Sequence, residues 1–136
     1  MATFNKFYSF GKALGDKIHN LNTDQLMVAL CASANAPVAT NAVLADLTQI
    51  SYTNLSTRNI TTTSWTQSLG TAKLLLVNLV LTTSGTVATF RYVAIYNNTA
   101  TNKELIGWVD YGTDISLFVN NTVTINFDAV SQITLV

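Results

Sequence analysis

Residues 86–111, TVATFRYVAIYNNTATNKELIGWVDY, constrain the fold of this chain more than any other stretch. Two runs rich in aromatic and β-branched residues, 87–96 and 104–111, flank a polar bend at 97–102. Period-two alternation on either side of an Asn/Thr loop is typical of a β-hairpin. Both faces of the first run carry apolar side chains, which predicts a hairpin that is covered on both sides.

Charged residues are scarce in this sequence. They make up 10% of the chain, and hydrophobic residues make up 49%, whereas an average soluble domain has about 25% charged residues. A monomer of this composition would expose large apolar surface patches, because it has few charged side chains to interrupt them. We therefore expect other protein chains to cover part of the surface.

The formal net charge is zero, and no stretch is strongly basic. Nucleic acids and anionic membranes both select clustered Lys and Arg, so we expect neither as a partner. The longest apolar run, 74–81, is interrupted by Asn78 and is too short to span a bilayer. The N-terminus lacks the apolar core and cleavage pattern of a signal peptide.

Short strand-like runs separated by turn residues recur along the rest of the chain. We predict strands at 25–32, 50–53, 58–65, 73–81, 115–119, 122–128 and 132–136, a helical turn at 42–47 and a chain-reversing turn at 111–114. The run 73–81 is apolar on both sides, which predicts a central strand. The spacing predicts a mainly β fold, an antiparallel, jelly-roll-like β-sandwich in one domain over residues 22–136.

Residues 1–21 carry the only convincing helical pattern. Apolar side chains recur at spacings of three, four or seven, at Phe4, Phe7, Leu14, Ile18 and Leu21. Gly11 and Gly15 each weaken such a helix by about 1 kcal/mol relative to Ala. Two interpretations remain open: an amphipathic helix that closes one end of its own β-core, or an arm whose Phe side chains dock on a neighbouring subunit.

The sequence offers few residues for catalysis or metal binding. We interpret the single histidine, His19, as a structural or solvated residue at the end of the N-terminal helix, and the single cysteine, Cys31, as a buried apolar residue. A zinc site needs more Cys or His than the chain has. Asp110 and Asp114 could offer oxygens to Ca²⁺, but this spacing is common by chance and we favour an Asp-stabilised turn. We expect no enzymatic activity, no cofactor and no metal.

The two tryptophans, Trp65 and Trp108, allow two interpretations. They could form a sugar-stacking platform, as in carbohydrate-binding sandwiches, or they could be core or interface anchors. We favour anchors. The residues predicted to contact other chains are Phe4, Phe7, Phe10, Trp65 and Trp108.

Residues 90–117, FRYVAIYNNTATNKELIGWVDYGTDISL, resemble a group of small virion proteins of tailed bacteriophages. A similar aromatic strand, "YN-T" bend and "LIGW-DYG" strand recur in those proteins. The N-terminal part resembles theirs as well, in a short helix ending in HNL at 19–21 followed by LMVALCASANAP and VLADLTQISYTNLSTR. The similarity spans most of the chain, and its motifs are structural rather than catalytic.

This family is similar to head decoration or cement proteins. The resemblance implies a β-sandwich that binds the outer surface of the icosahedral shell and bridges neighbouring capsomers. Its partner would be the major capsid protein and its location the virion, after synthesis in the host cytoplasm. A tail or connector component is the alternative within the virion. We further expect a homodimer or homotrimer.

Overall fold

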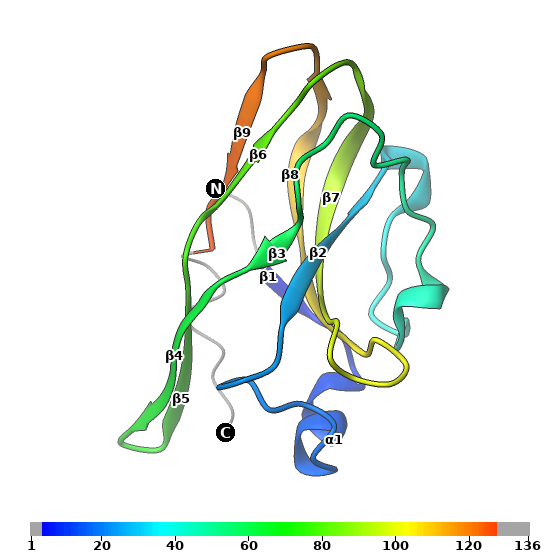
Figure 1. Ribbon diagram of the computed structural model, residues 1–136. Coiled ribbons are helices and arrows are strands. Elements are labelled where there is room, and N and C mark those ends of the chain that lie inside the picture. Colours follow the sequence, from blue (N-terminus) through cyan, green and yellow to red (C-terminus); the bar gives the residue numbers. More distant parts are fainter. Residues whose placement is uncertain (1–3, 128–136) are drawn as a thin grey trace.

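The computed structural model describes residues 4–127 and shows an elongated, mainly β molecule (Figure 1). Strands hold 48% of the residues and helices 10%. Every strand pair within the described residues is antiparallel. The predicted mainly β class with antiparallel sheets is therefore confirmed.

Five strands form one sheet in the order β1-β8-β7-β2-β3. Their bounds are β1 Phe4–Lys6, β2 Leu26–Cys31, β3 Asn59–Ile60, β7 Val87–Asn97 and β8 Leu105–Leu117. The predicted hairpin is confirmed as the β7–β8 pair, in which Val93 faces Val109 and Ala94 faces Trp108. The predicted buried strand at 25–32 is confirmed as β2.

The remaining strands form two pairs, β4 (Thr62–Ser68) with β5 (Thr71–Leu76) and β6 (Leu79–Thr82) with β9 (Thr122–Ile125). Further backbone hydrogen bonds connect the pairs. Val77 N–H donates to the Thr61 carbonyl at 2.9 Å, and Ser56 N–H donates to the Thr82 carbonyl at 3.0 Å. Residues 54–68 and 71–84 thus run side by side as one irregular hairpin, and β6 lies between β9 and residues 54–56.

Buried side chains lie on both faces of the five-stranded sheet. The main core joins residues of β2 and β7, such as Val28 and Phe90, to Leu74, Leu81 and Ile125 from the two strand pairs. On the other face, a smaller cluster contains Phe7, Ala29, Ala94, Tyr96 and Leu105. Here Leu44 and Leu47, within and just after the 3₁₀ turn η2 (Leu44–Asp46), pack against it. The prediction that the hairpin is covered on both sides is confirmed, and the chain itself supplies both covers.

The predicted helix over residues 1–21 is wrong in extent. The helix α1 is only Phe10–Gly15, and residues Phe4–Lys6 form β1 instead. Edge pairing explains the difference, because β8 offers unpaired backbone groups that β1 satisfies over three residues. Phe7 N–H extends this pairing by donating to the Ile106 carbonyl at 3.2 Å.

Two strand predictions and one turn prediction need correction. Residues 73–81 are not one central strand, because the run breaks at Val77-Asn78 into β5 and β6, and β5 has one strand neighbour, β4, within residues 4–127. Residues 50–53 form no strand, although Ile50 N–H donates to the Leu30 carbonyl at 3.0 Å. Residues 111–114 do not reverse the chain, because β8 continues through them to Leu117.

At 111–114 the strand β8 contains a bulge rather than a turn. Phe90 pairs with Ile115 and Tyr92 with Asp110, so β8 accommodates extra residues opposite Arg91. Gly112 permits this with a φ of 76°. The predicted helical turn at 42–47 is confirmed as η2. Another 3₁₀ turn, η1, spans Ser33–Asn35. The predicted strands at 58–65 and 122–128 appear in part, as β3, β4 and β9. The predicted strand at 132–136 lies outside the described residues.

Candidate interaction surface

One part of the molecule is almost free of charge. Segments 59–87 and 115–127 contain β4, β5, β6, β9 and their turns, and Lys73 is the only charged residue in them. We call these two segments the low-charge surface. Burying a charge is far more unfavourable than burying methyl or hydroxyl groups, so this part of the molecule is the easiest to dehydrate against another protein.

The low-charge surface also exposes most of the large apolar side chains. Nine such side chains are exposed among residues 4–127, and six of them lie here: Leu69, Leu75, Val77, Val80, Phe118 and Val119. Strand alternation explains two of them, because Leu74 and Leu81 point into the core and their neighbours Leu75 and Val80 therefore point outward. The surface runs from the β4–β5 turn to the β8–β9 turn, which lie at opposite ends of the molecule (Figure 1).

Hydroxyl-bearing residues surround this apolar strip. Leu75 faces Ser64 across the β4–β5 pair, and Val80 faces Thr124 across the β6–β9 pair. The sequence signal for the surface was the local scarcity of charge between residues 59 and 87, where Lys73 is the only charged residue, which a whole-chain average does not reveal. The exposure of Leu75 and Val80 could not be predicted, since the run 73–81 reads as a strand covered on both sides.

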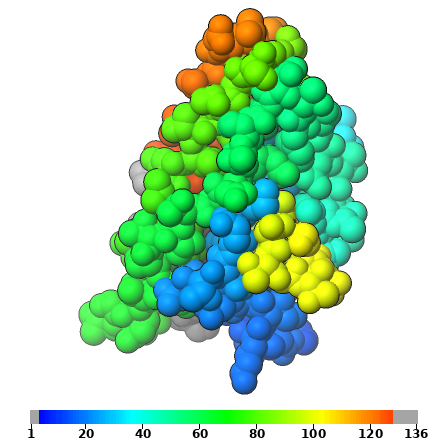
Figure 2. All heavy atoms as spheres, in the orientation of Figure 1, coloured from blue at the N-terminus to red at the C-terminus, as the bar shows by residue number. Residues whose placement is uncertain are grey.

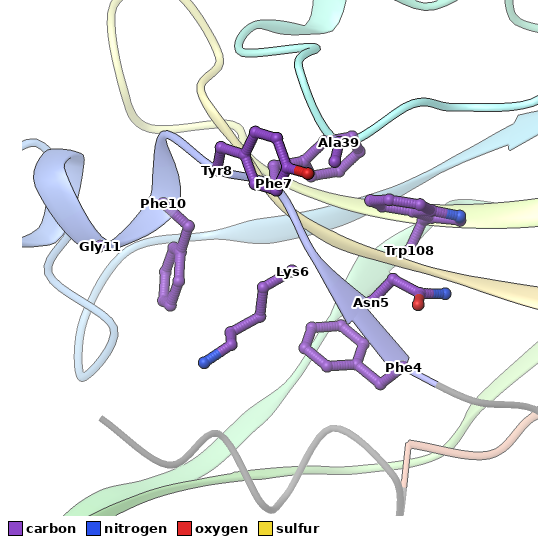
Figure 3. Close-up of a pocket in the computed structure, with 9 residues that line it drawn as sticks. All are labelled: Phe4, Asn5, Lys6, Phe7, Tyr8, Phe10, Gly11, Ala39 and Trp108. Atoms are coloured by element: carbon purple, nitrogen blue, oxygen red, sulfur yellow. The ribbon is translucent and has the colours of Figure 1, made fainter. Parts of the chain in front are cut away.

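A second feature is an open cavity of about 610 Å³ beside β1, the edge strand of the five-stranded sheet (Figure 3). Its lining residues are Phe4, Asn5, Lys6, Phe7, Tyr8, Phe10, Gly11, Ala39 and Trp108. We call it the N-terminal aromatic pocket. Phe7 and Trp108 lie on one side of β1 with ring centroids 4.7 Å apart, and Phe4 lies on the other side (Figure 3).

The structure brings together four of the five residues predicted to contact other chains. Phe4, Phe7, Phe10 and Trp108 all line the N-terminal aromatic pocket, although Phe7 and Phe10 are only 2% and 1% exposed. Trp65 lies elsewhere, on β4, where it packs against the main core. That these residues bind another chain stays a prediction.

Trp65 and Trp108 belong to different sites. Trp108 packs on the smaller cluster with Phe7, whereas Trp65 packs on the main core and lines a separate cavity with Leu14 and His19. The two indoles therefore do not share one cavity on which a sugar could stack.

His19 is a buried structural residue, which agrees with one of the two predicted roles, but it is neither solvated nor at a helix end, because α1 ends at Gly15. Its Nδ1 accepts a hydrogen bond from Asn97 Nδ2 at 3.1 Å, and the same amide donates to Asp24 Oδ2 at 2.7 Å. Because Nδ1 accepts, the neutral ring carries its proton on Nε2, a buried atom without a hydrogen-bond partner among the described residues. Burial lowers the pKa of His19, and the charges of Glu104 and Asp24 oppose this.

The other candidate residues have structural roles. Cys31 is a buried apolar residue, as predicted, and burial raises the pKa of its thiol to about 11, which disfavours the reactive thiolate. Asp110 accepts hydrogen bonds from Arg91 Nε at 2.9 Å and from Gly112 N–H at 2.7 Å. These bonds lower the pKa of Asp110 and fix the bulge. Within residues 4–127, no three His, Cys, Asp or Glu side chains are grouped to hold a metal ion.

Comparison of the chain with protein-family models, curated proteins and solved structures finds no match. Of the helices in residues 4–127, none has the length and apolarity needed to cross a bilayer.

Proposed function

We propose that this protein is a bacteriophage head decoration or cement protein that binds the assembled shell and stabilises it by bridging neighbouring capsid subunits. The low-charge surface is the observation that carries the proposal, because it places six exposed apolar side chains on a part of the molecule with a single charge. The resemblance of residues 90–117 to small virion proteins suggests which particle it binds. Its partner is then the major capsid protein, and its location is the outer surface of the virion head.

We also infer that the two groups of strands pack face to face as a jelly-roll-like β-sandwich. Support comes from the main core, in which Val28 and Phe90 of the five-stranded sheet join Leu74, Leu81 and Ile125 of the two strand pairs. Such an arrangement holds the outward side chains of β5 and β6 on a rigid support. A rigid surface loses little conformational entropy on binding.

The stabilisation works by mass action. A protein that binds the assembled shell but not its separated subunits stabilises the shell by about 2.7 kcal/mol per site when its free concentration is 100 times Kd. A standard interface takes about 800 Å² from each partner, and the chain has an accessible surface of 7136 Å². The remaining surface leaves room for a second neighbour, as bridging requires. No step needs an enzyme, and the role we propose is structural.

The test is to add the purified protein to shells that lack it and measure their resistance to heat. We expect wild-type protein to raise this resistance and Val80→Lys to bind about tenfold more weakly or worse, because it places a charge in a dehydrated contact. Val38→Lys is the matched control, since Val38 and Val80 are both 52% exposed and Val38 lies outside the low-charge surface.

Failure of wild-type protein to bind shells would contradict the proposed function, and equal binding of the two variants would contradict the role of this surface. Electron microscopy of particles carrying labelled protein separates the alternatives within the virion. Label on the head supports a decoration protein, whereas label on the tail or connector supports a component of those structures.

A further inference from the structure

The turn between β4 and β5 has an unusual residue at its tip. Leu69 and Gly70 connect the two strands, with φ angles of 51° and 83°, and Ser68 pairs with Thr71 across the turn. Two successive residues with positive φ define the type I′ hairpin turn, which favours Asn-Gly. The left-handed conformation is unfavourable for leucine, which has a Cβ. Leu69 is also fully exposed to solvent, at 102%.

Two unfavourable features therefore coincide at Leu69, and asparagine at this position would have neither. A residue held in a disfavoured conformation is a reason to look for a function. The β4–β5 hairpin projects from the body of the molecule at its lower left (Figures 1 and 2). Residues 62–72 carry no charge, so the tip is a neutral projection on which Leu69 is the one large apolar side chain.

The same chain has an open aromatic cavity that could receive such a projection. The N-terminal aromatic pocket, at about 610 Å³, falls within the range of about 300–1,000 Å³ of pockets that hold ligands. Among residues 4–127, Lys6 is the only charged residue that lines it. A neutral hairpin tip brings no like charge to Lys6, and aromatic rings offer Leu69 an apolar contact.

We propose that Leu69 of one copy inserts into the N-terminal aromatic pocket of a second copy of this chain. The occupant is a second copy because one sequence supplies both the apolar projection and the pocket. The two sites lie on different elements, β4–β5 against β1, α1 and β8, so the contact is either reciprocal across a two-fold axis or head-to-tail, in which case it closes into a ring where the rotation permits. The inference does not rest on the proposed function, which concerns binding to the shell.

The first test is Leu69→Asn, measured by sedimentation over a concentration series. We expect self-association to weaken about tenfold or more, as for the loss of a central apolar anchor. The melting temperature should stay the same or rise, because asparagine suits the turn. Val119→Asn is the matched control: Val119 is an exposed apolar residue within the β8–β9 turn, and its substitution should leave association unchanged.

The second test mixes two defective chains. Ala39→Trp fills the pocket but keeps Leu69, whereas Leu69→Asn removes the projection but keeps the pocket. Each variant alone should be monomeric, and their mixture should form a heterodimer and nothing larger, because it contains only one intact projection and one intact pocket per pair. This complementation shows that Leu69 of one copy contacts the pocket of another, in a reciprocal or a head-to-tail arrangement alike.

A wild-type protein that stays monomeric, a Leu69→Asn chain that associates like the wild type, or a mixture that stays monomeric would each overturn the inference. Adding Ala39→Trp, which fills the pocket and leaves the low-charge surface intact, to shells separates this inference from the proposed function. Shell binding by a monomeric Ala39→Trp chain leaves the proposed function standing when the self-contact is absent.

Discussion

The buried imidazole of His19 couples the stability of this fold to pH. Burial lowers its pKa in the folded chain, so the folded state binds the proton more weakly than the unfolded state. Stability is therefore complete above the unfolded pKa of about 6.5 and falls as the pH drops below it. We expect the free energy of unfolding in urea to decrease between about pH 7 and pH 5.

His19→Gln is the variant that isolates this effect, because its side-chain oxygen can accept the Asn97 hydrogen bond without titrating. The variant should lose most of the pH dependence in this range, since His19 is the only histidine. An unchanged slope would show that the carboxylates, and not His19, cause it.

Gly107 on β8 marks a close approach between two backbones. A Cβ at this position would lie 2.6 Å from the Asn5 carbonyl oxygen and 2.3 Å from Phe4 Cζ. Gly107→Ala should therefore push β1 away from β8 and destabilise the fold by about 1–3 kcal/mol. The measurement is thermal unfolding, with Gly11→Ala in α1 as the control.

The Gly11 position has open space around its would-be Cβ, so Gly11→Ala should raise stability by about 0.5–1 kcal/mol. Equal melting temperatures for the two variants would contradict the close packing of β1 on β8.

At the level of elements, the N-terminal segment decides between two interpretations of residues 1–21. Deletion of residues 1–20 removes β1, α1 and the buried side chains of Phe7, Phe10 and His19. Loss of one buried Phe typically destabilises by about 3–5 kcal/mol, against a total stability of about 5–15 kcal/mol. We expect the shortened chain to lose cooperative unfolding, as followed by circular dichroism. A folded, monomeric product would instead support a docking arm.

The same element shows where sequence patterns mislead. The helical spacing of Phe4 and Phe7 is real, but Phe4 lies on a strand because the edge of β8 supplies backbone partners.

At 111–114, turn-forming residues do not end β8. The β7–β8 pairing continues on both sides of the bulge, and the salt bridge between Arg91 and Asp110 lies beside it.

At the scale of the whole molecule, the charged residues and most of the exposed apolar side chains lie on different parts of the surface. Lys73 is the only one of the fourteen charged residues that lies on the low-charge surface, so the other thirteen lie in the rest of the chain. The exposed apolar side chains follow the opposite distribution. Whole-chain composition predicted that some surface would be covered by other chains, but it could not indicate which surface.

The sequence by itself determined the parts of this protein that depend on local alternation. The β7–β8 hairpin, strand β2, the η2 turn and the burial of Cys31 all follow from which side chains neighbour one another along the chain. A two-residue period assigns side chains to two faces, and that assignment needs no knowledge of the rest of the fold.

Only the tertiary structure decided what covers each face. It leaves Leu75 and Val80 exposed on a run that reads as buried, pairs Phe4–Lys6 with β8 as a strand, and brings Phe7 and Trp108 together with Phe4 around one pocket. The physical reason is that the burial of a side chain depends on residues distant in sequence, and the packing of the whole chain determines which of them contact it.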